Sequence, residues 1–412
     1  MVAGKNKIGS RIQPGRVAGT LKPENYLNCK KTIIMKRPIK KYCALIASVF
    51  LSFSLMAQGT GDVKDVVTID VVPENSIYQR IYQPFIAQWE EDYYVVSYGL
   101  QLRGKTDMAD IMCSISRDGG KTWSPPSMIF DHRIPNGSQQ YAYANPVLFI
   151  PEGQRVIWYF GMRCPVHYSD SEDSELCAAS SSDGGVTWQQ VELRMHFHSP
   201  LITNAGIVPV KEDGITRYLL PVHRNTLRHD PKGDREQFIL ESKNLLDWDL
   251  AAYIPRPEHV WLHEGNMAEG DHQGELKIVH RTAKYSNSGT LEPPRAWSSV
   301  SKDNGKTWSM AEEEPDLWNT ASKGFFGKDS YGRHIYVYND DERQIRKGLY
   351  YVVKEPGKEW SKPKLFYWDN NRNSYPTLIE KEPGVFLCVW DSSDDPDQKR
   401  TAIRFGILDL NQ

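Results

Sequence analysis

The chain has 412 residues, 40% of them hydrophobic and 25% charged, a globular composition long enough for two or three domains. From residue 58 onward, 39 Lys and Arg residues stand against 51 Asp and Glu residues, a formal net charge of −12. An acidic surface disfavours nucleic acid as a partner, because nucleic acid is bound by basic stripes. Any anionic ligand must therefore be held by a few locally placed arginines.

The first 57 residues differ from the rest, with 11 Lys or Arg residues against a single acid, Glu24. Several of these basic residues precede an apolar run of 13 residues, Cys43 to Leu55, which is followed by Met56 and Ala57, an imperfect small-residue cleavage site. This pattern predicts a signal peptide that is cut after Ala57, because 13 apolar residues are too few to span a bilayer.

Residues 1–34 have no role ahead of such a leader, so we expect Met35 to be the true start and 1–34 an upstream extension. The leader is then 35–57 and the mature chain 58–412. We expect the mature protein to be exported to the periplasm or beyond, to have no membrane span and to be a monomer.

Three near-identical octapeptides follow, Ser116–Trp123, Ser181–Trp188 and Ser301–Trp308, and each reads S-x-D-x-G-x-T-W. Asp can accept hydrogen bonds from its own turn, Gly adopts a conformation closed to other residues, and Trp packs the turn onto a sheet. Fainter copies are Ser242–Trp248 and Glu355–Trp360, and the five Trp residues are 65, 60, 60 and 52 residues apart. A repeat of this length indicates propeller blades of four short strands.

Short β-branched or aromatic stretches between the boxes read as strands, one per repeat. They are Tyr93–Tyr98, Arg155–Phe160, Tyr218–Val222, Leu276–Val279, His334–Tyr338 and Val385–Trp390. Near the mature N-terminus, Val67–Val71 could close the ring beside Ala402–Leu408. The sequence therefore predicts one all-β domain, a six-bladed β-propeller.

The octapeptides resemble the Asp-box, the bacterial neuraminidase repeat of sialidase-like β-propellers, and the resemblance covers about residues 75–410. It implies that the boxes are structural turns on the outside and that ligands bind where the inner strands converge at one end of the channel. It also places a general acid/base at Asp107, in a polar loop that begins at Arg103. From the residues alone, a solvated polar loop is the favoured interpretation of this stretch.

The resemblance assigns four further positions. Glu264, followed by Glu269 and Arg281, matches the family's order of Glu, second acid and arginine. Glu264 would activate a nucleophilic tyrosine, and Arg281 would bind the substrate carboxylate, for which a planar guanidinium is suited. Arg346 would be another carboxylate-binding arginine, with a surface ion-pair cluster as the alternative.

The nucleophile implied is Tyr375, in the stretch Asn373–Leu378 that opens the last repeat. An unperturbed tyrosine has a pKa of about 10, so it needs a neighbouring base. Sialidases are accordingly an exception to two-carboxylate glycoside hydrolysis. A tyrosine before proline can also simply pack at the start of a strand.

The chain departs from the family at its first arginine, where Tyr82 stands. Arg80 is two residues early, which in a strand keeps the face but shifts the side chain by roughly 7 Å. Arg80 and Arg103 remain candidates for substrate binding. The bound anion could therefore differ from sialic acid, with a uronic acid as one possibility.

Eight of the 11 histidines lie between His196 and His280. His198 and His263 are candidates for substrate binding or proton transfer, because imidazole is matched to neutral pH. No convincing ligand spacing accompanies them, so we expect no metal and no cofactor. Four cysteines stay in the mature chain, and both a Cys164–Cys177 disulfide and four free thiols are open.

Three functions follow. The first is an exported sialidase-like exo-glycosidase acting on an acidic oligosaccharide or glycan. The second is a lyase or dehydratase that uses Tyr or His as a base on uronic-acid-containing oligosaccharides in polysaccharide degradation. The third is a non-catalytic glycan-binding propeller, which the ordered acid, Glu, Arg and Tyr set disfavours.

Overall fold

The computed structural model describes residues 59–412 except 106–107, 135–138, 166–173, 226–234, 259, 285–294, 320–321, 340–345 and 394–400. The described residues form 26 strands in five hydrogen-bonded sheets, and the sequence prediction of an all-β chain is confirmed. None of these residues belongs to a helix with the length and apolarity needed to cross a membrane.

The strands follow one another around the sheets in chain order. An eight-stranded sheet holds β2 (Tyr78–Glu90), β3 (Tyr93–Leu102), β4 (Ala109–Ser116), β5 (Ser127–Phe130), β6 (Tyr141–Phe149), β7 (Ile157–Pro165), β8 (Glu175–Ser181) and β9 (Gln189–Val191). A six-stranded sheet holds β10 (Arg194–Met195), β11 (Ile202–Thr203), β12 (Val208–Glu212), β13 (Ile215–Asn225), β14 (Arg235–Ser242) and β15 (Asp247–Tyr253).

Three four-stranded sheets complete the fold. The first holds β16 (Val260–Glu269), β17 (Leu276–Lys284), β18 (Arg295–Ser301) and β19 (Glu312–Trp318). The second holds β20 (Phe325–Lys328), β21 (His334–Tyr338), β22 (Leu349–Lys354) and β23 (Lys364–Tyr367). The third holds β24 (Asn373–Glu382), β25 (Val385–Ser392), β26 (Ala402–Asp409) and β1 (Lys64–Val71).

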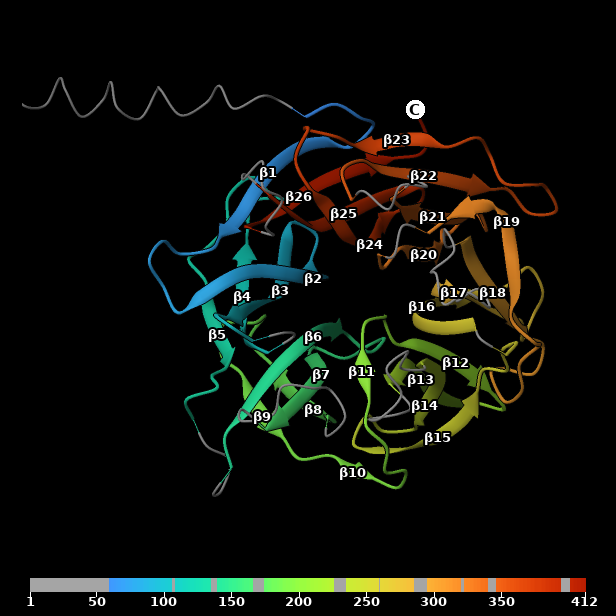
Figure 1. Cartoon of the computed structure of the whole chain (residues 1–412), viewed down its shortest axis with the longest axis horizontal. Helices are drawn as coiled ribbons and strands as arrows, with labels where there is room; N and C mark the ends of the chain where they lie inside the picture. The colour runs from blue at the N-terminus through green and yellow to red at the C-terminus, as the bar shows by residue number, and fades with distance from the viewer. Residues whose placement is uncertain are drawn as a thin grey trace, which may run out of the picture. The chain divides into compact units, whose positions relative to one another are not determined.

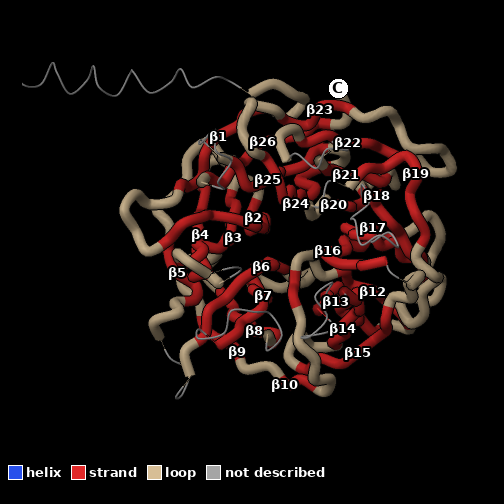
Figure 2. Tube along the Cα trace, viewed as in Figure 1, coloured by secondary structure: helices blue, strands red, loops and turns tan. Residues whose placement is uncertain are grey.

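The sheets of the unit Ala57–Gln412 stand in a ring, and the strands nearest its middle are β2, β6, β11, β16, β20 and β24 (Figure 1). Figure 2 shows that strands make up nearly all of this ring and that loops join them at its rim and ends. The ring closes between the two ends of the unit, because β1 pairs antiparallel with β26 in a register that includes Val67↔Phe405. The predicted closure is therefore confirmed, and the six predicted strand stretches lie within β3, β7, β13, β17, β21 and β25.

Apolar layers between neighbouring sheets hold the ring together. Ile81 of β2 and Val96 of β3 lie in one buried cluster with Val389 of β25, and Leu219 of β13 shares another with Leu262 of β16. Full burial of one such side chain stabilises a fold by about 1.5–3 kcal/mol. Each sheet is apolar on both faces, so no sheet is stable without its two neighbours.

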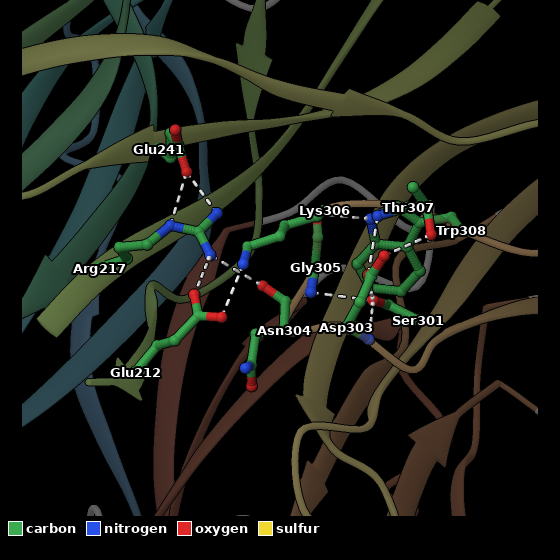
Figure 3. A network of polar contacts seen from close by, with 10 residues as sticks. All are labelled: Glu212, Arg217, Glu241, Ser301, Asp303, Asn304, Gly305, Lys306, Thr307 and Trp308. Carbon is green, nitrogen blue, oxygen red and sulfur yellow. Dashed lines mark hydrogen bonds and ion pairs between the residues drawn. The ribbon is translucent and has the colours of Figure 1, made fainter. Parts of the chain in front are cut away.

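The three Asp-boxes form the same turn. In the third box, which Figure 3 shows from close by, Asp303 accepts hydrogen bonds from Ser301 Oγ at 2.8 Å and from Thr307 N and Oγ1 at 2.8 and 2.6 Å. Trp308 Nε1 donates to the carbonyl of Gly305 at 3.2 Å. Gly305 has a φ of 82°, and a Cβ there would lie 2.6 Å from Leu219 of the neighbouring sheet, so the glycine is needed for both reasons.

The third box also joins two sheets (Figure 3). Arg217 of β13 donates to the carbonyl of Asn304 at 3.2 Å while its guanidinium is paired with Glu241. Lys306 reaches Glu212 of β12 at 2.6 Å. The box is thus fully engaged in internal contacts, which fits the structural part that the sequence predicted for it.

The possible disulfide between Cys164 and Cys177 is wrong. Both residues are buried free thiols, as are Cys113 and Cys388. In the register of β7 and β8, Cys177 lies opposite Gly161, three residues from Cys164. An odd offset puts the two side chains on opposite faces of the sheet, and they belong to different apolar clusters.

Candidate active site

Four strands that line the middle of the ring carry the same irregularity. Each has a β-bulge at which one residue other than glycine takes a positive φ of 51–57°, a conformation that costs of order 1–3 kcal/mol. These residues are Gln83, Asn145, Glu264 and Tyr375. The register breaks at each of them, between Tyr82/Phe85, Ala144/Val147, His263/Asn266 and Ser374/Thr377.

The local sequence explains why the ladder tolerates the bulge. Proline has no N–H to donate to a neighbouring strand and is confined to edges and bulges within sheets. Pro84, Pro146 and Pro376 directly follow three of the four bulge residues. In the fourth strand Gly265 takes this place, and its N–H donates to Gln237 Oε1 at 3.0 Å instead of to the ladder.

The bulges bring Glu264 and Tyr375 together from two different sheets. The hydroxyl of Tyr375 donates to Glu264 Oε1 at 3.2 Å. Nη1 of Arg281, on β17, lies 2.7 Å from Glu264 Oε2 and 3.2 Å from the Tyr375 hydroxyl. Glu264 and Tyr375 are only 7% and 4% exposed, so this cluster of three residues is largely withdrawn from water.

The charges in the cluster are balanced. Burial acts to raise the pKa of Glu264, but the cations around it, above all Arg281, outweigh this and lower the pKa to about 2. Burial acts to lower the pKa of Arg281, and Glu264 raises it above its ordinary value. Glu264 is therefore an ionised acceptor that faces the hydroxyl of Tyr375.

A second cation faces the tyrosine. The Arg346 guanidinium carbon lies 5.4 Å from the centre of the Tyr375 ring. The carbonyl of Arg346 accepts the N–H of Asn373 at 2.9 Å, which fixes the segment before β22 against the start of β24. Arg281 and Arg346 therefore lie beside the same tyrosine, and their predicted role in one anion site stays a prediction.

The other predicted site residues are placed differently. Arg103 is exposed and donates to the backbone carbonyls of Ser76 and Tyr78 at 3.3 and 3.2 Å, so its guanidinium is used to hold the chain. Arg80 is exposed on β2, and His198 is exposed in the segment between β10 and β11. No described contact joins these three residues to Tyr375 or Glu264.

His263 and Tyr82 are buried, at 1% and 0% exposure. Tyr82, where the resemblance implies an arginine, is thus a buried side chain of β2. His263 lies beside His223, with ring centres 5.8 Å apart, and burial lowers the pKa of His223 to about 3. Asp107 lies outside the described residues, so its predicted role stays a prediction.

The sequence did not single out several residues that hold the site. His223 Nδ1 accepts the backbone N–H of Glu264 at 3.4 Å. Lys323, just before β20, is 3% exposed and lies in the middle of the ring, where it bonds to Thr377 Oγ1 at 3.1 Å. The repeated residue–Pro pairs inside apolar strands were the available signal for Gln83 and Asn145, but nothing in the local sequence marks Lys323.

One group of side chains has the spacing of a metal site, namely Asp110, Asp131 and His132. Its atoms already have partners within the described residues. Asp110 accepts the Tyr78 hydroxyl at 2.5 Å and His132 N at 2.6 Å, and Asp131 forms an ion pair with Arg133 at 2.7 Å. This group explains how the loop after β5 is held, and we infer no metal from it.

The fold defines an all-β, propeller-like class of protein. The family model of the BNR repeat-like domain matches residues 92–402, and the chain belongs to this family. No curated protein matches the chain.

Solved structures resemble the fold at low identity. The NanB sialidase from Streptococcus pneumoniae is 12% identical with a TM-score of 0.63, over 84% of this chain and 70% of that one. The Hadza microbial sialidase Hz136 is 15% identical with a TM-score of 0.63, over 84% and 68%. The α-L-arabinanase of Penicillium chrysogenum is 13% identical with a TM-score of 0.59, over 86% and 99%. At such identities the likeness concerns the fold alone.

Proposed function

We propose that this protein is a sialidase-like exo-glycosidase that acts on carboxylate-bearing glycans. The observation that carries the proposal is the contact of the Tyr375 hydroxyl with both the ionised Glu264 and Arg281. A buried tyrosine paired with a carboxylate and a cation is suited to nucleophilic catalysis, because the base takes the proton as the oxygen attacks. The family and the fold of the similar sialidases support the same chemistry.

In the proposed reaction, the oxygen of Tyr375 forms a bond to the anomeric carbon while the bond from that carbon to the leaving oxygen breaks. Glu264 receives the tyrosine proton, and Asp107 gives a proton to the leaving oxygen. Water, which returns a proton to Asp107, then displaces Tyr375, and the tyrosine regains its proton from Glu264. A neutral nucleophile avoids repulsion by the substrate carboxylate, which Arg281 and Arg346 hold.

Arginine is suited to this task because its planar guanidinium binds a carboxylate through two parallel hydrogen bonds. When the substrate carboxylate engages Arg281, the guanidinium neutralises Glu264 less effectively, and Glu264 becomes a stronger base. The Streptococcus pneumoniae structure is a complex with 2-[(3-chlorobenzyl)ammonio]ethanesulfonate, a zwitterion whose sulfonate group is consistent with an anion site in this fold.

A second candidate is elimination on a uronic-acid-containing oligosaccharide by a lyase or dehydratase. The buried Tyr82 favours it, since the first strand offers no arginine there for a sialic acid carboxylate. In this reaction Tyr375 or His223 would remove the proton beside the carboxylate, and Arg281 would neutralise the charge that develops.

The deciding experiment incubates residues 58–412 with a fluorogenic α-sialoside and, in parallel, with a panel of uronate oligosaccharides read by mass spectrometry. Release of sialic acid supports hydrolysis, whereas a new double bond or loss of water in the uronates supports elimination. Tyr375→Phe keeps the ring and removes only the hydroxyl, so we expect it to abolish turnover. Undiminished turnover in this variant would refute the role of Tyr375.

We also propose the finer features of the chain. We count six blades, because the eight-stranded sheet consists of β2–β5 and β6–β9, joined at the single pair Ala109↔Tyr143. The basic and apolar composition of residues 35–57 supports an exported protein whose mature chain begins at residue 58. Mass spectrometry of the secreted product and light scattering would test the cleavage site and the monomeric state.

A further inference from the structure

A group of polar side chains lies in the middle of the ring at the level of the bulges. Gln83 on β2, Asn204 before β12 and Lys323 before β20 are 6%, 5% and 3% exposed. Gln83 Nε2 lies 3.5 Å from Asn204 Oδ1, and Lys323 Nζ donates to the carbonyl of Asn204 at 3.2 Å. We call these three residues the channel floor.

The channel floor is linked to the candidate active site by two short paths. Lys323 Nζ donates to Thr377, two residues beyond Tyr375 on β24. Asn266, two residues beyond Glu264 on β16, donates to the carbonyl of Gly324 at 3.0 Å. A cavity of about 790 Å³ is lined by residues that follow the floor residues closely in the chain, namely Phe85, Gly206 and Phe325.

The channel floor has both a hydrogen-bond acceptor and a hydrogen-bond donor that are not used. Among the described residues, Gln83 Oε1 and Asn204 Nδ2 have no hydrogen-bond partner. Lys323 has three N–H groups, of which the two bonds above use two. Buried polar groups without a partner are costly, so their presence beside a candidate active site points to a ligand group. The long bond between Gln83 and Asn204 can open, because terminal amide torsions have broad minima.

The floor suits a hydroxyl rather than a carboxylate. A carboxylate only accepts hydrogen bonds and would face the oxygen of Gln83, whereas a hydroxyl donates to that oxygen and accepts from Asn204 or Lys323. Burial lowers the pKa of Lys323 to about 8, while the nearby carboxylates of Glu264 and Asp391 act to raise it, so Lys323 already has two anions near it.

We propose that the channel floor binds a hydroxyl group of an acidic sugar whose carboxylate is held by Arg281 and Arg346. This assignment rests on the proposed function for the carboxylate and adds the orientation of the sugar. The charged edge of the sugar faces β17 and the segment before β22, and a neutral, hydroxyl-bearing edge faces Gln83 and Asn204. Selection among carboxylates then depends on their hydroxyls.

The test compares ligands that differ only in what the floor would bind. Calorimetric titration measures the affinities of N-acetylneuraminate, D-glucuronate and cyclohexanecarboxylate, the last of which has a six-membered ring and a carboxylate but no hydroxyl. We expect Asn204→Leu to weaken binding of the tighter acidic sugar by about tenfold or more and to change cyclohexanecarboxylate binding less than about twofold. Asn319→Leu replaces a buried amide outside the floor and should change neither affinity.

Gln83→Met, which keeps the length of the side chain, repeats the test if Asn204→Leu does not fold. An equal effect on the sugar and on cyclohexanecarboxylate overturns the proposal, as does failure of both sugars to bind the wild-type protein. Arg281→Met tests the carboxylate separately. If it leaves all three affinities unchanged while the floor variants still weaken sugar binding, the proposed anion site fails and the hydroxyl subsite stands.

Discussion

Replacing Arg281 by Met should reveal how much of the stability of this protein depends on one buried ion pair. Arg281 Nη1 lies 2.7 Å from Glu264 Oε2, and Glu264 is only 7% exposed. Methionine fills much of the same volume without a charge. The substitution therefore leaves the Glu264 carboxylate buried with its main counter-ion removed.

The magnitude follows from the pKa of Glu264, which is lowered from 4.5 to about 2 in the folded protein. A depressed carboxylate pKa contributes stability above pH 4.5 and loses it as the pH falls towards 2. At 1.36 kcal/mol per unit, the contribution at neutral pH is about 3 kcal/mol. In Arg281→Met the effect of burial remains, so we expect the pKa of Glu264 to rise and the protein to lose about 3–5 kcal/mol at pH 7.

Urea unfolding followed by Trp fluorescence at pH 7 and pH 5 measures this. The loss of unfolding free energy in Arg281→Met relative to the wild type should be smaller at pH 5 than at pH 7. At pH 5, Glu264 of the variant can be protonated, whereas Glu264 of the wild type stays ionised and still stabilises the fold. Adding Glu264→Gln to the variant should restore part of the loss. The control is Arg194→Met, whose exposed pair with Asp247 should be worth less than about 1 kcal/mol. A deficit that is the same at both pH values and unaffected by Glu264→Gln would refute the reasoning.

Three further outcomes follow from the structure. Asp303→Ala removes the hydrogen-bond acceptor of an Asp-box and should lower the free energy of urea unfolding by about 2 kcal/mol. The control Asp316→Ala, at an exposed position, should lower it by less than about 0.5 kcal/mol. Equal losses in the two variants would contradict the dependence of the turn on Asp303. Burial lowers the pKa of Lys323 from 10.5 to about 8, so its charged form costs stability below pH 8. Between pH 7 and pH 10, the free energy of unfolding of the wild type should therefore rise by about 2–3 kcal/mol relative to that of Lys323→Met. A difference between the two proteins that stays constant with pH would contradict this. Thiol titration of residues 58–412 without reductant should find four reactive thiols in urea and none in the native protein. The native thiols are buried, and burial raises the pKa of Cys113 and Cys177 to about 12. Only two reactive thiols in urea would indicate a disulfide.

The sequence predicted the outer parts of the fold better than its centre. The Asp-box depends on contacts within eight residues, so its pattern is local and can be read directly. The ring closure of β1 with β26 also followed, because both ends of the chain offered an apolar strand. The Cys164–Cys177 pairing failed because the face of each side chain depends on the register of β7 and β8, which spacing alone does not give.

The candidate site was predicted in part for a related reason. Glu264, Arg281 and Tyr375 were found through their resemblance to a family, and they do lie in contact. Lys323 and Asn204 were not found, because they meet across the ring only after all the sheets are assembled. Arg103 looked suitable from its place in a polar loop, but carbonyl groups of the preceding chain occupy its guanidinium.

The departure from the family at Tyr82 bears on how an acidic ligand could lie in the ring. Tyr82 is fully buried, and a Cβ added to the adjacent Gly99 would lie 3.1 Å from its ring, so no space exists there for a hydrated cation. Tyr82→Arg would bury a guanidinium beside Gly99, and an unpaired buried charge costs several kcal/mol. A third arginine beside Arg281 and Arg346 could therefore not be introduced at this position without a loss of stability. Arg281 and Arg346 both lie beside Tyr375, and in the proposed binding mode an acidic ligand places its charge there and turns an uncharged edge towards Gln83.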